Sequence, residues 1–274
     1  MRMLILGATG FLGSNLFQLA SKNDELSVFG TSRYPQKKST IIQVDVTDKQ
    51  SIGNAIREIN PEVVVWCLMH EEENHLINVG LKNLLSEMDS DTRLIFLSTD
   101  AVFVEGKGGY KEVDPIGILP KEAPLAVYVN AKNFGENLIL DSHPNHVILR
   151  TGPLYVDEEN NIDKRTLQVI EKVKENKPFE AYTNVFRSFV NINDLSSVIL
   201  ELSKIKLNGI LHAGPLHKES YYTFYKKRLG KLGLDSSLIC PIMISKEEKP
   251  YLSFDTSLNT QKAQQLLKSK FREV

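Results

Sequence analysis

The sequence predicts an α/β fold built on a doubly wound parallel sheet, with a smaller C-terminal lobe. Through the first half of the chain, short apolar runs alternate with segments whose apolar residues recur at helical spacing. Two of these runs, VVVW at 63–66 and LIFL at 94–97, contain no polar residue, which is typical of strands covered on both faces. A glycine-rich turn connects the first apolar run to the first helical segment.

Residues 1–150 are interpreted as one unit, because strand and helix patterns alternate throughout them. We expect strands at Met3–Leu6, Leu26–Thr31, Thr40–Val44, Glu62–Cys67, Arg93–Ser98 and His146–Arg150. We expect helices at Leu12–Lys22, Asp48–Asn60, Leu76–Met88 and Ala131–Asp141.

Residues 151–274 have a looser pattern and are interpreted as a smaller substrate-binding lobe interleaved with the first unit. Asp48 and Asp194 have the side chain and position of helix N-caps. Helices are expected at Lys164–Asn176, Asp194–Lys204, Ser220–Leu232 and Thr256–Lys268, and strands at Ser188–Ile192 and Gly209–His212.

The overall charge of the chain excludes some partners. A formal net charge of −1 provides no basic field for nucleic acid or for an acidic membrane surface. No apolar stretch approaches the length of a membrane span. The two cysteines, Cys67 and Cys240, form no disulfide framework, which favours a cytoplasmic location. The sequence leaves the oligomeric state open, with a homodimer as one possibility.

The first candidate site is the turn GATGFLG at 7–13, which follows a strand and begins a helix. Glycines at such a turn allow a tight bend, the close approach of a pyrophosphate and close helix–strand packing. The helix N-terminus adds free N–H groups and a favourable dipole. We therefore expect a dinucleotide here, in the manner of a Rossmann fold, although a purely structural turn is the alternative. The expected contacts are Gly7, Thr9, Gly10, Phe11, Leu12 and Gly13.

The end of the second predicted strand bears on the choice of cofactor. A site for NAD commonly places an acidic residue there, against the ribose hydroxyl. This chain has Ser32 and Arg33 instead, which suit a 2′-phosphate, so NADP is predicted over NAD. The alternative is that Arg33 is a solvated surface charge. After the third strand, Asp45 and Val46 are candidates for contact with adenine, with helix capping as the alternative role.

Tyr128 and Lys132 are spaced four residues apart, which places them on one face of a helix. A free tyrosine has a pKa of about 10, which is too high for ready proton exchange at neutral pH. A neighbouring ammonium favours the phenolate and is expected to lower that pKa. The pair would then give a proton to a carbonyl oxygen or take one back. A Tyr/Lys surface face is the alternative.

Thr99 ends the fifth predicted strand, at the sheet edge where doubly wound folds bind ligands. Its hydroxyl would bind a substrate carbonyl together with the tyrosine. A simple turn or cap formed by Ser98, Thr99 and Asp100 is an equal alternative.

Taken together, these motifs resemble the extended short-chain dehydrogenase/reductase family, and within it the dTDP-4-dehydrorhamnose reductase branch. The resemblance is carried by GATGFLG, LIFLSTDAVF, YVNAK with Gly135 and Glu136 after it, and RSFVNINDL. It implies an NADPH-dependent reductase of a nucleotide-activated 4-keto sugar, in which Tyr128 is the general acid. Lys132 would hold the nicotinamide ribose, and Thr99 the C4 carbonyl. Asp100 and Ala101 would border the substrate, and Arg187 would meet its diphosphate.

The chain departs from this branch mainly at 67–75, where CLMHEEENH is short and acidic and is expected to be a solvated loop. His70 and His75 lack the spacing that places two ligands on one helical face, so no metal is expected. The departure keeps two alternatives open. One is a nucleotide-sugar epimerase or dehydratase. The other is a non-catalytic NADP-binding regulator, as in the regulatory β subunit of methionine adenosyltransferase, which is similar to the same branch.

Overall fold

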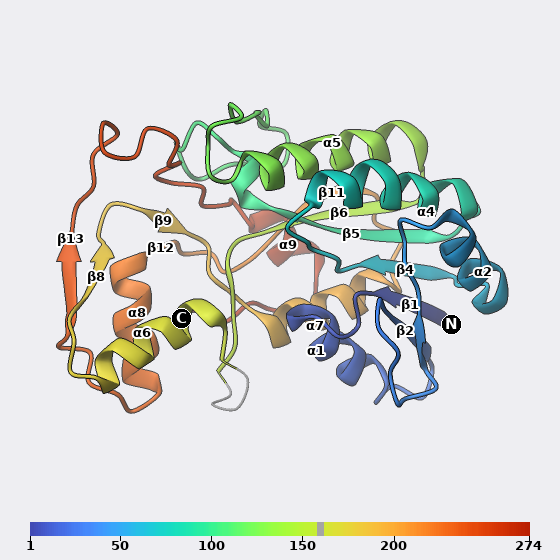
Figure 1. Cartoon of the computed structure of the whole chain (residues 1–274), viewed down its shortest axis with the longest axis horizontal. Coiled ribbons are helices and arrows are strands. Elements are labelled where there is room, and N and C mark those ends of the chain that lie inside the picture. The colour runs from blue at the N-terminus through green and yellow to red at the C-terminus, as the bar shows by residue number, and fades with distance from the viewer. Residues whose placement is uncertain (158–161) are drawn as a thin grey trace.

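Seven parallel strands form the central sheet in the computed structural model, which describes residues 1–157 and 162–274 (Figure 1). Their order is β11-β6-β5-β4-β1-β2-β3, so the chain winds outward from β1 to β3 and then returns to the other side of β1. The strands are β1 (Arg2–Leu6), β2 (Ser27–Ser32), β3 (Ile41–Gln43), β4 (Val63–Trp66), β5 (Arg93–Thr99), β6 (His146–Thr151) and β11 (Gly209–Ala213).

Helices cover both faces of this sheet, which confirms the predicted doubly wound fold (Figure 1). One face packs against α1 (Phe11–Ala20), α7 (Ile192–Leu202) and α9 (Gln261–Leu266). The other packs against α2 (Lys49–Ile59), α4 (Lys82–Glu87) and α5 (Ala126–Ser142). The apolar runs of β4 and β5 are buried along their whole length between these two layers. The crevice between the carboxyl ends of β1 and β4 is where such sheets bind ligands.

Polar side chains and a left-handed residue mark where several of these helices begin or end. The Asp48 carboxylate accepts a hydrogen bond from the backbone N–H of Gln50 at 2.9 Å, which confirms the predicted cap of α2. The helix ends at Asn60, whose φ of 46° is left-handed, just before Pro61. The predicted cap at Asp194 is wrong. Asn191 caps α7, and Asp194 lies in the first turn, where its carboxylate pairs with Arg272.

The smaller lobe lies at the left of Figure 1. Its core combines aliphatic and aromatic side chains, with Phe189 stacked on Phe224 at a centroid distance of 3.8 Å. β11 comes from the same half of the chain but belongs to the main sheet, and α7 packs against that sheet. The division at residue 150 stays a prediction. The lobe is built from α6 (Lys164–Lys174), α8 (Tyr221–Lys231), the parallel pair β8 (Phe179–Tyr182) and β13 (Ile239–Ile242), and the antiparallel pair β9 (Phe186–Arg187) and β12 (Glu219–Ser220).

Some predicted boundaries were wrong. Helix α5 begins at Ala126, ahead of the predicted Ala131, so it includes Tyr128. Of the helix predicted at Thr256–Lys268, only α9 is observed. Residues 255–258 are not helical, and Asp255 and Leu258 form isolated β-bridges. The strand predicted at Ser188–Ile192 is reduced to β10 (Val190–Asn191), which pairs in parallel with β7 (Leu154–Tyr155). In the described ranges no helix is long and apolar enough to cross a membrane.

A buried ion pair joins α5 to the sheet. The Arg150 guanidinium, on β6, donates to the Glu136 carboxylate at 2.7 and 3.1 Å, and both side chains are almost fully buried. The Ser98 hydroxyl donates to the same carboxylate. Removing either partner of such a pair destabilises the fold strongly, because the remaining charge stays buried without compensation.

We therefore expect Glu136→Ala to lower the free energy of unfolding by about 3–5 kcal/mol, because it leaves the Arg150 guanidinium buried without its counter-charge. Urea unfolding followed by circular dichroism measures the change. The control is Glu175→Ala, since Glu175 pairs with Lys177 in an exposed bridge with side chains 59% and 66% exposed. We expect that control to change stability by less than about 1 kcal/mol. Equal effects of the two substitutions would contradict the assignment.

Candidate active site

The glycine turn between β1 and α1 has the close packing that its sequence predicts. Gly7 has a φ of +85°, which a residue with a side chain rarely adopts. A Cβ at Gly13 would lie 2.0 Å from the Gly7 carbonyl oxygen, so only glycine fits there. Gly10 caps α1 and offers no side chain to the first-turn N–H groups. The turn therefore presents free donors and a helix dipole, an arrangement that suits phosphate.

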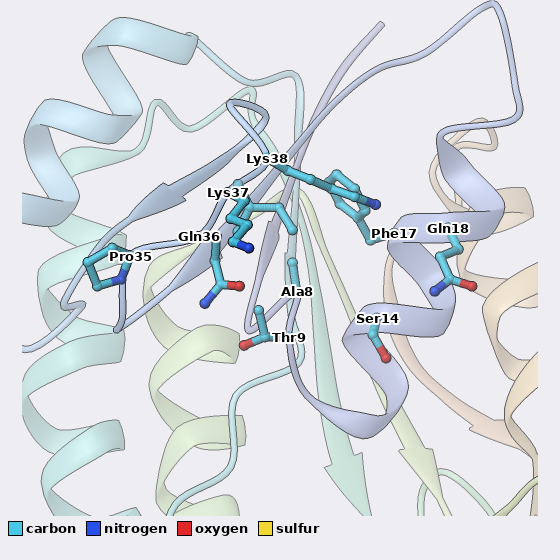
Figure 2. Close-up of a pocket in the computed structure, with 10 residues that line it drawn as sticks. Ala8, Thr9, Ser14, Phe17, Gln18, Pro35, Gln36, Lys37 and Lys38 are labelled. Atoms are coloured by element: carbon cyan, nitrogen blue, oxygen red, sulfur yellow. The ribbon is translucent and has the colours of Figure 1, made fainter. Parts of the chain in front are cut away.

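Beside this turn lies a pocket of about 580 Å³ (Figure 2). Thr9 reaches it from the turn, and Gln36, Lys37 and Lys38 reach it from the segment between β2 and β3. The Lys38 ammonium lies 5.8 Å from the centroid of the Phe17 ring, on α1. No acidic side chain is among the described residues that line the pocket, so its charge favours an anion.

The residues predicted to choose the cofactor lie at the end of β2. The buried Ser32 hydroxyl accepts hydrogen bonds from the Tyr34 N–H at 3.2 Å and from the Gln36 amide at 3.3 Å. Arg33 is exposed, and its guanidinium lies 3.5 Å from His70 Nε2. Ser32 thus shapes the β2–β3 segment, while Arg33 keeps its charge at the surface of the crevice.

A second, smaller pocket of about 210 Å³ is lined in part by Arg33. The Asp45 carboxylate accepts hydrogen bonds from the Thr47 N–H and hydroxyl at 2.9 and 2.7 Å, and these bonds hold the pKa of Asp45 below its usual value. Val46 is buried and packs against Gly80, so its side chain does not line this pocket. The lining residues are Arg33, Asp45, Thr47, His70, Glu72, His75 and Leu76.

Tyr128 and Lys132 lie one turn apart on α5, as the spacing predicts. The Lys132 ammonium donates to the Leu97 carbonyl of β5 at 3.1 Å and lies 5.9 Å from the centroid of the Tyr128 ring. Thr99, the last residue of β5, hydrogen-bonds with the Tyr128 phenol, and its hydroxyl also accepts the Ala101 N–H at 3.2 Å. The structure therefore brings the three predicted residues together, and the predicted capping role of Thr99 is confirmed beside it.

The electrostatics of the phenol differ from the expectation. Burial raises the pKa of Tyr128 well above its usual value, while the hydrogen bond with Thr99 acts in the opposite direction. The charges of Glu73 and Asp100 raise the pKa further. The net direction is therefore opposite to the lowering predicted from Lys132: burial has the largest effect on the pKa of Tyr128, and a carboxylate lies against that ammonium.

That carboxylate belongs to Glu73, in the segment expected to be a solvated loop. The expectation is wrong at this residue: Glu73 is 1% exposed, and its Oε1 lies 3.0 Å from Lys132 Nζ. Its Oε2 accepts the His70 N–H at 2.8 Å. Glu73 begins α3 (Glu73–His75), which runs directly into η1 (Leu76–Leu81) and α4. The helical segment predicted at Leu76–Met88 therefore begins earlier, at Glu73, and the Glu73 carboxylate in its first turn faces Lys132.

The predicted substrate residues also lie close to one another. Asp100 is buried directly after Thr99, and burial raises the pKa of its carboxyl group. Arg187 Nε lies 4.0 Å from Asp100 Oδ2. The guanidinium also donates to the carbonyls of Phe186 at 2.6 Å and Ser253 at 2.9 Å, which fixes its position. Ala101 follows in the short helix η2 (Asp100–Val102) and is half-buried.

Sequence analysis missed four residues of this region: Glu73, His70, Lys37 and Lys38. The lysine doublet was visible as a basic pair shortly after the predicted cofactor-selecting Arg33. For Glu73 there was no local signal, because its neighbours Glu71 and Glu72 have the same side chain and both are exposed.

Comparisons with known proteins bear on the family and the fold of the chain. A family model described as the RmlD substrate binding domain matches residues 1–273. The chain is 25% identical over 261 residues to methionine adenosyltransferase 2 subunit beta from Danio rerio, covering 88% of this chain and 77% of that protein. It is 29% identical over 180 residues to a dTDP-4-dehydrorhamnose reductase from Aggregatibacter actinomycetemcomitans, covering 61% of this chain and 56% of that protein.

Among solved structures, the fold is similar to that of a dTDP-4-dehydrorhamnose reductase from Bacillus anthracis str. Ames, solved in complex with NADP. The TM-score is 0.73 and the sequence identity is 21%, and the match covers 89% of this chain and 84% of that one. At this identity the likeness bears on the fold, and it confirms the predicted fold class.

Proposed function

Because the chain belongs to the family described as the RmlD substrate binding domain, we propose that it is an NADPH-dependent reductase of a nucleotide-activated 4-keto sugar. The match over nearly the whole chain confirms the resemblance predicted from the motifs. The observation that carries the proposal is the convergence of Thr99, Tyr128 and Lys132 at the end of β5. The relatives named as dTDP-4-dehydrorhamnose reductases support the substrate class.

The crevice fits a dinucleotide with a 2′-phosphate. The free N–H groups at the start of α1 would hold the pyrophosphate at Gly7, Gly10 and Gly13, with Thr9, Phe11 and Leu12 in the same turn. Ser32 and Arg33 would border the 2′-phosphate, joined by the two lysines of the larger pocket. Asp45 and the backbone of Val46 would border adenine. When bound, NADPH supplies a hydride to the substrate carbonyl carbon.

The protein side of the chemistry is proton transfer. The Tyr128 hydroxyl would donate its proton to the carbonyl oxygen as the carbonyl carbon becomes that of an alcohol. The resulting phenolate would regain a proton from water. Thr99 would hold the carbonyl oxygen beside Tyr128, and Lys132 would hold the nicotinamide ribose. Asp100, Ala101 and Arg187 would border the sugar nucleotide.

A non-catalytic cofactor-binding subunit is the second candidate function. The departure of residues 67–75 from the sequence of the reductase branch favours it. The similarity to methionine adenosyltransferase 2 subunit beta supports it as well. An epimerase or dehydratase would regenerate its cofactor in each turnover, so stoichiometric oxidation of NADPH separates that alternative from a reductase.

Replacing the proposed acid tests the function directly. We expect Tyr128→Phe to lower kcat by about a hundredfold to ten-thousandfold, because the carbonyl oxygen loses its proton donor. NADPH oxidation in the presence of a dTDP-4-keto-6-deoxy sugar measures turnover, and a fluorescence titration checks that NADPH still binds. The control is Tyr251→Phe, at a tyrosine 42% exposed. Near-normal turnover in Tyr128→Phe would exclude the mechanism. Absence of turnover in the unsubstituted protein, with a partner bound in stoichiometric amount, would favour the regulatory subunit.

The choice of cofactor is tested by binding. We expect tighter binding of NADPH than of NADH, because Arg33, Lys37 and Lys38 carry positive charge toward the 2′-phosphate. Arg33→Ala should weaken NADPH binding about tenfold and leave NADH binding unchanged, since a hydrogen bond to a charged group contributes about 1.5–3 kcal/mol. Lys174→Ala, in the smaller lobe, is the matched control. NADH binding as tight as NADPH binding would contradict the prediction.

We also propose a homodimer in the cytoplasm. The outer face of α5 exposes apolar side chains, with Val127 47%, Phe134 39% and Leu140 45% exposed. Both cysteines are free, which suits a reducing compartment.

Light scattering should give about twice the chain mass of 30.9 kDa. Phe134→Lys should return the mass to that of one chain, because a charge cannot be buried in an apolar interface without compensation. The exposed Leu216→Lys is the control. A monomeric mass for the unsubstituted protein would contradict the dimer.

A further inference from the structure

The contact between Glu73 and Lys132 is unusual because neither charge reaches solvent. The two side chains are 1% and 3% exposed, and Glu73 Oε1 lies 3.0 Å from Lys132 Nζ. Among the described residues, Glu73 Oε1 has no hydrogen-bond partner, so its contact with Lys132 is counted as an ion pair alone. The other oxygen is held by the His70 N–H at 2.8 Å. The carboxylate is therefore fixed in place from both sides.

The position of the Glu73 carboxylate affects the electrostatic potential at the Tyr128 phenol. An ammonium alone beside the phenol would stabilise the phenolate. A carboxylate in contact with that ammonium offsets the effect, because the two charges form a neutral pair. Lys132 is held in this arrangement by the Leu97 carbonyl at 3.1 Å and by the Phe96 ring, whose centroid is 4.9 Å from Nζ.

The other charged groups around the site do not replace the lysine. Asp100, at the end of β5, also disfavours the phenolate, and its own nearest cation is Arg187, on β9. On α5, Glu136 is one turn beyond Lys132 and is neutralised by Arg150 of β6. After β4, the buried Cys67 thiol has a raised pKa and carries no charge at neutral pH. Glu73 is thus the group that cancels the cation next to the phenol.

On the basis of the proposed reductase function, we propose that Glu73 is a positioning residue. By pairing with Lys132, it keeps the Tyr128 hydroxyl protonated, and so able to donate to a substrate carbonyl, into the alkaline range. The segment at 70–75 then has a chemical role that its acidic composition did not reveal. Burial is the largest cause of the raised pKa of Tyr128, and the charge of Glu73 acts in the same direction.

The proposal is tested first on the protein without cofactor, by tyrosinate absorbance. Comparing each protein with its Tyr128→Phe version isolates the ionised fraction of Tyr128. At pH ~10, the usual tyrosine pKa, we expect little phenolate in the unsubstituted protein and about tenfold more in Glu73→Gln. Glu71→Gln, at an exposed neighbour, should behave like the unsubstituted protein. Glu73→Asp should restore the low phenolate fraction, because it restores a carboxylate.

Equal phenolate fractions in Glu73→Gln and the unsubstituted protein would overturn the proposal. Half-ionised Tyr128 at pH ~10 in the unsubstituted protein would overturn it as well, and this measurement stands if Glu73→Gln does not fold. In turnover, Glu73→Gln should move the alkaline limb of the kcat/KM profile about one pH unit lower. The absorbance titration needs no substrate, so its failure is distinct from a failure of the proposed reductase activity.

Discussion

Two buried ion pairs on α5 hold the candidate active site in place. Lys132 pairs with Glu73 at 3.0 Å, and one turn later Glu136 pairs with Arg150 at 2.7 Å. Each pair is nearly without solvent, so each charge requires its partner, and the helix cannot rotate or slide without exposing an uncompensated charge. Tyr128 lies on the same helix, one turn before Lys132 and two turns before Glu136. Its position relative to β5 therefore depends on both pairs.

Much of the architecture was predictable because it follows from local patterns. The unbroken apolar runs of β4 and β5 must be covered on both faces of the sheet. Because these strands alternate along the chain with amphipathic helices, the pattern predicts a doubly wound sheet. The turn at 7–13 was equally predictable. Its glycines stand between a predicted strand and a predicted helix, and the structure shows why they are needed: Gly7 has a left-handed φ, and Gly13 leaves no room for a Cβ.

The parts that sequence did not predict depend on contacts between distant segments. Nothing near Glu73 distinguishes it from Glu71 and Glu72, and only the approach of Lys132, far along the chain, accounts for its burial. The start of α5 was misplaced because the turn before Ala126 has no side-chain cap to mark it. The helix predicted from Thr256 was shortened because residues there pair with Lys107 and Tyr110 instead.

The segment at 70–75 contacts parts of the crevice that come from distant positions in the sequence. His70 contacts Arg33 at the end of β2, and Glu72 lines the smaller pocket, while Glu73 turns inward to Lys132. The His70 N–H holds the Glu73 carboxylate directly, so the residue beside the proposed 2′-phosphate contact is bonded to the one beside the proposed acid–base pair. A displacement of His70 at the cofactor end would remove a donor from Glu73 and so alter the charge balance at Tyr128. The short acidic segment therefore joins the proposed 2′-phosphate contact to the proposed acid–base pair through the contacts of His70.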